Sequence, residues 1–327
     1  MKALMPVPEE FIHFIQTGTK FIIAGHREPD GDCIGSQLAL CSILTRMGKE
    51  SIACSAGPFR RAEVAPYANQ FKAIPDEKDK AGARLILIDC SEHERTGDLE
   101  QHIKHLPTGI IDHHATAKTF PATEKLPYYI DPAEPAVTLM ILSLVVSLGL
   151  ELTKEEAELL LLGLCTDTGF FRHIEENSAE IFIKTAELLK AGVSLKKAYH
   201  AIYGGKSLNS RIMLGRVLSR SKMFLDKRLI ISYEHYDDVK ELGMESRDSE
   251  VLYQQLQSVT GAEVVAFIRQ ENENHCSVGL RSRDHIDVGI IAHELGGGGH
   301  KHASGFNIDG DIASVQKLIL EKIQKLL

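Results

Sequence analysis

The chain has 327 residues, of which 43% are hydrophobic and 25% are charged, and its net charge is −8. These proportions are typical of a globular protein, and the length favours two domains. The acidic balance argues against a protein that holds long duplex nucleic acid on a broad basic face. It is compatible with a small phosphorylated substrate bound at a local site.

The cysteines and the apolar segments indicate the compartment. None of the six cysteines forms a C-x-x-C pair, and a chain of this length does not need disulfides, so we predict free thiols in a reducing environment. The N-terminus has no apolar segment followed by a cleavage site. The longest apolar stretch, residues 139–150, is shorter than the about 20 residues of a bilayer span. We therefore expect a cytoplasmic protein without a membrane partner.

The first half of the chain alternates between predicted strands and helices. A helical pattern covers residues 34–47 and ends at Gly48, and helices dominate residues 137–220. Short apolar strands separated by helices are typical of a parallel sheet that is covered on both faces. The predicted strands are residues 21–24, 85–88 and 109–111, with weaker signals at 51–54 and 128–130.

The second half predicts a smaller α/β domain. Glycine, serine and lysine residues near positions 193–207 mark a connection between domains. We expect a catalytic domain at residues 1–190, a helical linker at 191–215 and a second domain at 216–327. The predicted strands of the second domain are 228–233, 262–269 and 276–280, and its predicted helices are 248–258, 286–295 and 312–326.

Metal-ligand residue types follow three predicted strands and close one apolar helix. At the carboxyl ends of parallel strands, such side chains converge on one edge of the sheet. An aspartate at a helix C-terminus is unfavourable for the helix, which indicates another role. The residues are His26, Asp30 and Asp32 after the first strand, Asp89 after the third, Asp112, His113 and His114 after the fourth, and Asp167 at the helix end.

Several carboxylates in one crevice repel one another, and divalent cations remove that cost. Four aspartates and two divalent ions sum to zero charge, which predicts a two-metal site. Aspartate in Pro-Asp-Gly-Asp is also a good turn or cap residue, so the prediction depends on the recurrence of the pattern. We expect Gly31 to let the loop turn tightly around the ions. Asp89 is the expected bridge, His26 and Asp30 complete one metal, and Asp32, His113 and Asp167 complete the other.

These motifs resemble a known family. In order, H-x-x-x-D-x-D, the strand-end aspartate, D-H-H and T-D-T-G are similar to the four motifs of the DHH phosphoesterase superfamily. Residues 296–305, GGGGHKHASG, resemble the glycine-rich signature of its DHH-associated C-terminal domain. The length and motif set resemble the bacterial nanoRNase and pAp phosphatase type. The resemblance implies an active site in the cleft between the two domains, two ions that are most often Mn²⁺, and a homodimer. It also implies that Asp112 supports the ligands and that His114 faces the phosphate, as the catalytic pair.

The glycine run predicts a phosphate-binding element. One glycine would suffice to stop the preceding helix, whereas four in a row let successive N–H groups approach an anion. Arg281 follows a predicted strand in an L-R-S pattern that, by the same resemblance, contacts a phosphate, and a guanidinium binds phosphate through two donors. The expected substrate-binding residues are Arg281, Gly297, Gly298, Gly299, His300 and Ser304.

The expected activity is hydrolysis of short oligoribonucleotides and dinucleotides such as pNpN to mononucleotides, together with pAp to AMP. A cyclic-dinucleotide phosphodiesterase acting on c-di-AMP would use the same residues and stays open as an alternative. An inorganic pyrophosphatase is disfavoured by the GGGGH run, and a long-strand exonuclease by the chain length and acidic charge. A nucleotide- or RNA-binding module without catalysis would have no use for six metal ligands.

Overall fold

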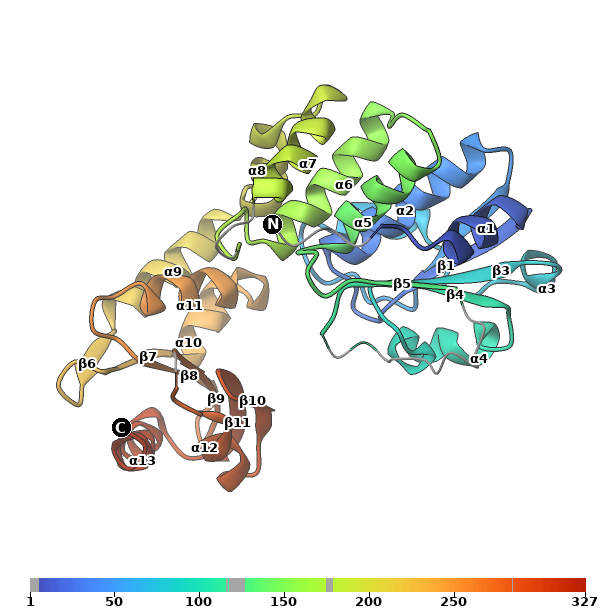
Figure 1. The fold of residues 1–327 in the computed structure, drawn as a ribbon. Helices are drawn as coiled ribbons and strands as arrows, with labels where there is room; N and C mark the ends of the chain where they lie inside the picture. The colour runs from blue at the N-terminus through green and yellow to red at the C-terminus, as the bar shows by residue number, and fades with distance from the viewer. Residues whose placement is uncertain (1–5, 116, 118–126, 175–178, 284) are drawn as a thin grey trace. The chain divides into compact units, whose positions relative to one another are not determined.

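The computed structural model describes residues 6–115, 117, 127–174, 179–283 and 285–327. The chain forms two compact units, Met1–Gly205 and Lys206–Leu327, which run from blue to yellow and from yellow to red in Figure 1. The junction falls in the segment that the sequence indicated as a connection, and the finer domain boundaries stay a prediction. Within the described residues, no helix has the length and apolar character that a membrane crossing requires.

The N-terminal unit is built on a parallel sheet of five strands in the order β2-β1-β3-β4-β5. All five strands that the sequence predicted are confirmed. Each is a short apolar run, because both faces of the sheet are covered. The strands are β1 (Lys20–Gly25), β2 (Glu50–Cys54), β3 (Arg84–Ile88), β4 (Thr108–Asp112) and β5 (Tyr128–Ile130).

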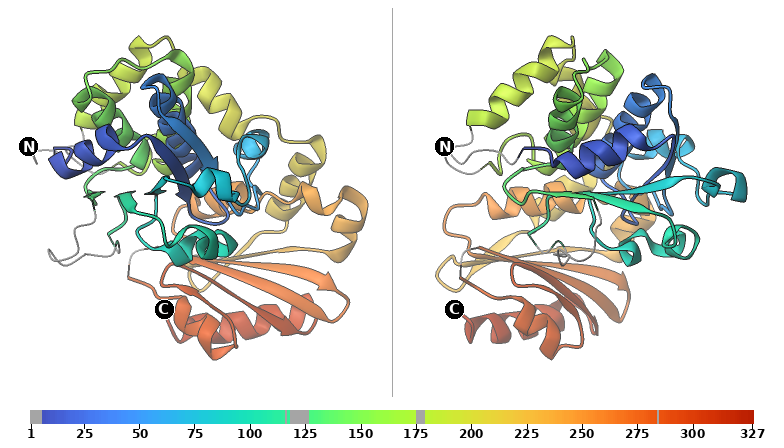
Figure 2. Two further views of the ribbon diagram at one scale, coloured as in Figure 1. Left: turned by 90° about the vertical axis from the view of Figure 1, so that its right-hand side faces the viewer. Right: turned by 45° about the vertical axis from the view of Figure 1, so that its right-hand side comes forward.

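Helices cover both faces of this sheet (Figures 1 and 2). Ile23 and Ile86 point into a core formed with helices α1, α2, α5, α6 and α7, and Ile22 and Leu87 point to the opposite core with α4. The alternation follows from the two-residue period of a strand. The helices are α1 (Glu9–Thr17), α2 (Gly31–Arg46), α3 (Glu77–Lys80), α4 (Glu100–Ile103), α5 (Val137–Ser147), α6 (Lys154–Asp167), α7 (Ala179–Lys190) and α8 (Leu195–Tyr203).

Glycines let α2 and α6 pack closely. A Cβ atom at Gly35 would lie 2.5 Å from the carbonyl oxygen of Leu159, and one at Gly31 would lie 2.5 Å from Oγ1 of Thr166. The predicted reason for a glycine at position 31, a tight turn of the loop around the ions, was therefore wrong. Gly31 is the first residue of α2, its φ lies outside the left-handed region, and its missing side chain makes space for the end of α6. The close packing brings the first turn of α2 beside Asp167.

The C-terminal unit is built on a mixed sheet of six strands in the order β10-β11-β9-β8-β7-β6. The three predicted strands correspond to β7, β8 and β9, and the predicted helices to α11, α12 and α13. Strands β6, β10 and β11 and helix α10 were not predicted. The strands are β6 (Lys222–Phe224), β7 (Leu229–Glu234), β8 (Val264–Asn272), β9 (His275–Ser282), β10 (Gly298–His300) and β11 (Ala303–Asp309).

Two layers of helices cover this second sheet, as both views of Figure 2 show. On one face, Phe306 and Val278 pack with α12 and α13, and on the other face Ile230 and Phe267 pack with α9, α10 and α11. The unit therefore has its own core. The helices are α9 (Leu208–Ser219), α10 (Tyr236–Leu242), α11 (Ser249–Gln257), α12 (Gly289–Glu294) and α13 (Ile312–Gln324).

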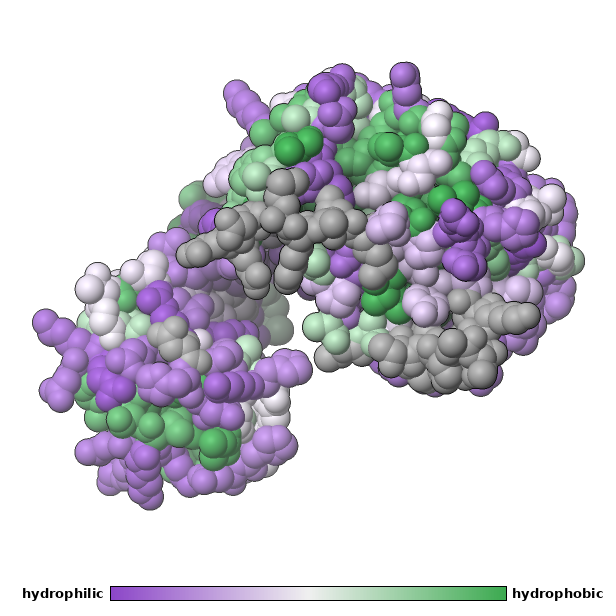
Figure 3. Space-filling view, viewed as in Figure 1, coloured by the Kyte–Doolittle hydropathy of each residue, from purple (hydrophilic) through white to green (hydrophobic). Residues whose placement is uncertain are grey.

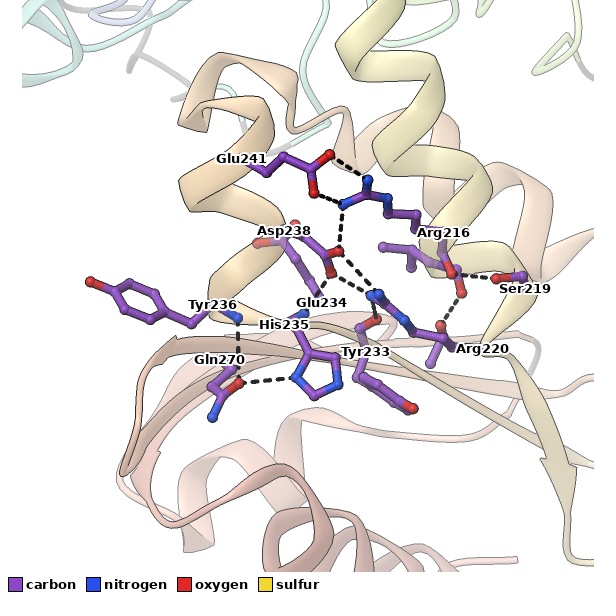
Figure 4. A network of polar contacts seen from close by, with 12 residues as sticks. Arg216, Ser219, Arg220, Tyr233, Glu234, His235, Tyr236, Asp238, Glu241 and Gln270 are labelled. Atoms are coloured by element: carbon purple, nitrogen blue, oxygen red, sulfur yellow. Dashed lines mark hydrogen bonds and ion pairs between the residues drawn. The ribbon is translucent and has the colours of Figure 1, made fainter.

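An ion-pair network around the buried Asp238 ties α9 to α10 (Figure 4). Asp238, which is 4% exposed, accepts hydrogen bonds from Arg220 (Nη2 to Oδ1, 3.0 Å) and from Arg216 (Nη1 to Oδ1, 3.1 Å). Arg216 also donates two hydrogen bonds of 2.7 Å to Glu241. Burial alone would raise the pKa of Asp238, but the hydrogen bond from Arg220 and the other donors outweigh it and lower the pKa to about 2.

Hydrophobic residues also reach the surface of the N-terminal unit, where green patches lie among hydrophilic side chains over its helices (Figure 3). Large exposed side chains of α5 and α7 include Val146, Phe182 and Ile183. Single apolar residues at a surface are common and need no special explanation.

Candidate metal centre

The metal-ligand residue types meet at the carboxyl edge of the first sheet. His26 follows β1, Asp89 follows β3, and His113 follows β4, while Asp32 lies in the first turn of α2 and Asp167 ends α6. Asp89 is held with a left-handed φ of 60°, which is unfavourable for a residue other than glycine. Strained backbone of this kind is frequent at functional sites.

Asp89 lies at the centre of the cluster. Its Oδ2 is 3.4 Å from Nε2 of His26, and its Oδ1 is 3.5 Å from Nε2 of His113 and 3.6 Å from Nδ1 of His114. The residue is 2% exposed, and Oδ1 has no hydrogen-bond partner within the part of the chain that is described. A buried carboxylate oxygen without a donor is costly, and a cation would satisfy it.

Two histidines are fixed so that the same ring nitrogen faces Asp89. Nδ1 of His26 lies 2.9 Å from the backbone carbonyl of Arg27, and Nδ1 of His113 lies 3.1 Å from that of Glu134. A carbonyl oxygen only accepts hydrogen bonds, so each Nδ1 carries a proton and each Nε2 is the ring nitrogen left to face Asp89. This is the usual support of a histidine that binds a metal. The role of Glu134 could not be predicted from the sequence, because this residue acts through its backbone carbonyl.

Asp167 and Asp32 complete the second side of the cluster. Oδ2 of Asp167 lies 3.3 Å from Nε2 of His113, and ligand atoms of Asp32, His113 and Asp167 all lie within 4.8 Å of one another. The two oxygens of Asp32 also accept hydrogen bonds from the first N–H groups of α5, at Val137 (2.6 Å) and Thr138 (2.9 Å). Asp32 therefore caps α5 as well, and each of its oxygens retains a second lone pair.

Asp30 is less central than the sequence predicted. Its Oδ1 accepts a hydrogen bond of 3.1 Å from the backbone N–H of Cys33 and so caps α2, while its Oδ2 is 3.9 Å from Nε2 of His26. Instead, ligand atoms of His26 and Asp89 and the sulfur of the buried Cys33 all lie within 4.8 Å of one another. The assignment of Asp30 as a ligand stays a prediction.

The electrostatics of the cluster favour a bound cation. Burial, together with the negative charges of Asp32 and Asp89, raises the pKa of Asp167. Burial and the charge of Asp89 likewise raise the pKa of Asp32. Carboxylates that resist ionisation in one another's presence are stabilised as anions when a divalent ion lies between them. The donor set of carboxylates and imidazoles suits a divalent ion such as Mn²⁺, Mg²⁺ or Zn²⁺.

His114 and Asp112 form a pair beside this cluster. Nδ1 of His114 lies 2.8 Å from Oδ1 of the buried Asp112, and this hydrogen bond raises the pKa of His114. Both side chains line a pocket together with Asp89 and Arg95. Arg95 was not predicted as a site residue, because it lies in a short 3₁₀ helix after β3, His93–Leu99, that carries no motif.

The predicted substrate-binding residues lie in the C-terminal unit, close together on one edge of its sheet. Part of the glycine run forms a strand, because Gly298–His300 is the edge strand β10 and pairs with β11. As an edge strand, β10 keeps one side of its backbone outside the ladder, so outward N–H groups still exist for a ligand. A Cβ atom at Gly297 would lie 2.2 Å from the carbonyl oxygen of Gly305, and Gly299 has a φ of 132°, so both positions require glycine.

The remaining predicted residues flank β10. His300 is exposed at its end and pairs with Ala303, which in turn pairs with Arg281 of β9. Partners in a ladder point to the same face, so His300 and Arg281 share one face of the sheet. Ser304 is buried and donates a hydrogen bond of 2.9 Å to the carbonyl of Val288, which gives its hydroxyl a structural role.

The chain belongs to the DHH family. Residues 20–164 match the DHH family, N-terminal domain, and residues 226–327 match the DHHA1 domain. The two matches fall in the N-terminal and C-terminal units respectively. The combination of a parallel-sheet unit, an acidic cluster at its carboxyl edge and a second α/β unit is therefore that of a two-domain DHH protein.

Named relatives match almost the whole chain. The bifunctional oligoribonuclease and PAP phosphatase NrnA of Thermus thermophilus is 32% identical over 93% of this chain and 89% of its own length. The protein of the same name from Bacillus subtilis is 27% identical over 91% of this chain and 92% of its own length. A crystal structure of an exopolyphosphatase-related protein from Bacteroides fragilis shares the fold, with a TM-score of 0.80 and 22% identity over 99% of this chain and 98% of that one.

Proposed function

We propose that the protein is a metal-dependent phosphoesterase that hydrolyses short oligoribonucleotides to mononucleotides and removes a phosphate from pAp. The observation that carries the proposal is the buried Asp89 carboxylate, whose unpartnered oxygen faces the imidazoles of His113 and His114. The names of the relatives from Thermus thermophilus and Bacillus subtilis support this substrate class. Six free cysteines are consistent with a cytoplasmic enzyme.

Two divalent ions, with Mn²⁺ as the expected metal, would be held by the acidic cluster. His26, Asp30 and Asp89 would hold one ion, and Asp32, Asp89, His113 and Asp167 the other. When bound, such ions supply a Lewis acid for the phosphoryl oxygens and lower the pKa of water to near neutrality. The residues do the rest: the fixed tautomers of His26 and His113 present Nε2, and Asp89 contributes one oxygen to each side.

His114 is the proposed proton donor. Its Nδ1 proton is held by Asp112, which raises the pKa of the ring and so favours the form with a second proton on Nε2. That proton is available to a phosphoryl or leaving oxygen in the pocket that His114 lines. Asp112 does not touch the substrate in this scheme; it orients the ring.

Binding of further phosphates is assigned to the second unit. Arg281, His300 and the backbone of Gly297, Gly298 and Gly299 supply cationic and N–H donors, and the Ser304 hydroxyl ties β11 to the start of α12. A guanidinium and an edge strand recognise phosphates without reading bases. This division predicts a preference for substrates of a few nucleotides with a terminal phosphate.

A turnover panel tests the proposal. Full-length protein is freed of metal with a chelator, reloaded with Mn²⁺, Mg²⁺ or Zn²⁺, and supplied with pAp, di- to pentaribonucleotides, c-di-AMP, pyrophosphate and a long single strand. We expect Mn²⁺-dependent mononucleotide release from the short ribonucleotides and AMP release from pAp. Turnover of pyrophosphate or c-di-AMP alone, or equal turnover without metal, would contradict the proposal.

A further inference from the structure

We propose that Tyr253 is a positioning residue that holds Arg281 ready to bind a substrate phosphate, and that Gly279 is the glycine that makes this possible. The inference rests on the proposed function, because it takes Arg281 as a phosphate contact. All three residues belong to the C-terminal unit, where α11 packs on β8 and β9.

The ring of Tyr253 is a fixed platform under the Arg281 guanidinium. Cζ of Arg281 lies 4.2 Å from the centroid of the ring, within the range of a cation–π contact. Tyr253 is 8% exposed, and its ring packs edge-on against Phe267 at 6.2 Å between centroids. A ring that is buried on one side cannot turn freely, so it restricts the flexible arginine side chain above it.

Gly279 provides the space that the tyrosine hydroxyl occupies. Gly279 and Arg281 are two residues apart in β9 and therefore lie on the same face of the sheet. A Cβ atom at Gly279 would lie 1.9 Å from the hydroxyl oxygen of Tyr253 but 3.2 Å from the ring carbon that bears it. Any larger residue would push the tyrosine away from its place beneath Arg281.

The charge of Arg281 is left available for a ligand. One of its amino groups, Nη1, donates a hydrogen bond of 2.9 Å to the carbonyl of Leu280. Within the described ranges, which omit residue 284, no carboxylate lies within 4.0 Å of its guanidinium. Five other arginines of the same unit do hold carboxylates in ion pairs: Arg211, Arg216, Arg220, Arg228 and Arg247. An aromatic face restrains a guanidinium without neutralising it, and its other N–H donors stay free for a phosphate.

The test compares two variants of the platform with loss of the guanidinium itself. Steady-state kinetics of the Mn²⁺-loaded full chain use the dinucleotide pApA, and calorimetry measures the Kd of pAp on metal-free protein, where no turnover is needed. We expect R281A to raise KM and Kd about 10- to 100-fold. Y253L should raise both about 3- to 10-fold with kcat nearly unchanged, and Y253F, which keeps the ring, should stay within about 2-fold of wild type.

Two further comparisons separate positioning from mere packing. Lys240 lies 4.2 Å from the ring centroid of Tyr236, so Y236L removes a cation–π contact of the same length in the same unit and should leave KM unchanged. G279A should raise KM and Kd as Y253L does. The double variant G279A/Y253F lacks the clashing hydroxyl and should return most of the way to wild-type values, a rescue that loss of packing alone would not produce.

The outcomes are distinguishable. If R281A weakens binding while Y253L and G279A do not, the positioning role is wrong and the proposed function stands. If R281A has no effect on KM or Kd, both the phosphate contact and the positioning role are wrong. If no substrate is turned over but pAp binding still depends on Arg281 and Tyr253 as described, the positioning role holds and the proposed hydrolysis fails.

Discussion

A buried aspartate in each unit shows how differently the two units treat acidic charge. In the C-terminal unit, Asp238 accepts hydrogen bonds from Arg216 and Arg220, and its pKa is lowered to about 2. In the N-terminal unit, Asp32 lies among other carboxylates, and its pKa is raised by burial and by the charge of Asp89. The same residue type, buried in both places, is stabilised as an anion by the chain in one and not in the other.

The difference identifies which acidic cluster is structural. A buried carboxylate that the chain itself neutralises can be accounted for by folding alone. A buried cluster whose charges the chain does not balance needs a cation from solution. The unpartnered oxygen of Asp89 indicates the same requirement. The metal proposal therefore requires that burial of the Asp89 carboxylate costs free energy when no ion is bound. A metal ion should have no effect on Asp238.

The largest expected effect comes from removing Asp89. D89A should lower kcat for pApA by at least about 10³-fold, because one carboxylate is assigned to both ions and several kcal/mol of charge stabilisation depend on them. Metal content, measured by plasma mass spectrometry after gel filtration, should fall with activity. The fold should persist, because the substitution removes a repulsive buried charge.

The matched control is D238N, which alters an equally buried aspartate of the other unit. It should bind metal like wild type and keep its kcat when the measurement is made well below its unfolding temperature. Full activity of D89A in excess Mn²⁺, or a metal loss in D238N that matches that of D89A, would remove the distinction between the two clusters.

The next effect in size is on stability and its dependence on pH. D238N leaves Arg216 and Arg220 without their shared buried anion, which should cost about 2 kcal/mol of unfolding free energy at pH 7. The pKa of Asp238 falls from its ordinary 3.8 to about 2 on folding, so its stabilisation is complete above about pH 4 and is lost as the pH falls toward 2. Urea unfolding followed by circular dichroism should show wild type and D238N converging over that interval. A constant difference between them down to pH 2 would mean that the effect of the substitution is steric.

Much of this picture followed from the sequence, and the failures have physical reasons. The central strands of the first sheet were predicted because they are apolar runs bounded by polar turns, as in LILI before Asp89, and the two weaker signals also proved to be strands. Strand β10 was missed because its residues, Gly-Gly-His, have no strand propensity, and it forms only by pairing with β11. Gly31 was assigned to a turn because the approach of α6 cannot be read from local sequence.

The candidate site shows the same limit. The residues that gather around Asp89 carry motifs and could be named from the sequence. The supporting groups could not, because they act through the backbone: the carbonyl of Glu134 fixes His113, and the N–H groups of Val137 and Thr138 fix Asp32. Nearly every residue carries the same backbone N–H and carbonyl groups, so the sequence does not single any of them out. Only the fold shows which of them face a side chain.

The smallest expected effect comes from Arg95. This residue tests whether the N-terminal unit supplies a positive charge to its own acidic cluster, as the C-terminal unit does for Asp238. It lines the pocket that contains Asp112 and His114, so it is a cation placed at the margin of an acidic cluster. Its exposed side chain can contact a phosphate that has entered the pocket, in a setting where solvent weakens the attraction. R95A should therefore raise KM for pApA about 5-fold with little change in kcat, and more at low ionic strength. The control is K104A on the nearby helix α4, where the lysine pairs with Glu100 at 3.2 Å and should not affect KM. An R95A defect in kcat alone would instead place Arg95 against the reacting phosphate. In that case the chain itself would supply a positive charge to the acidic cluster.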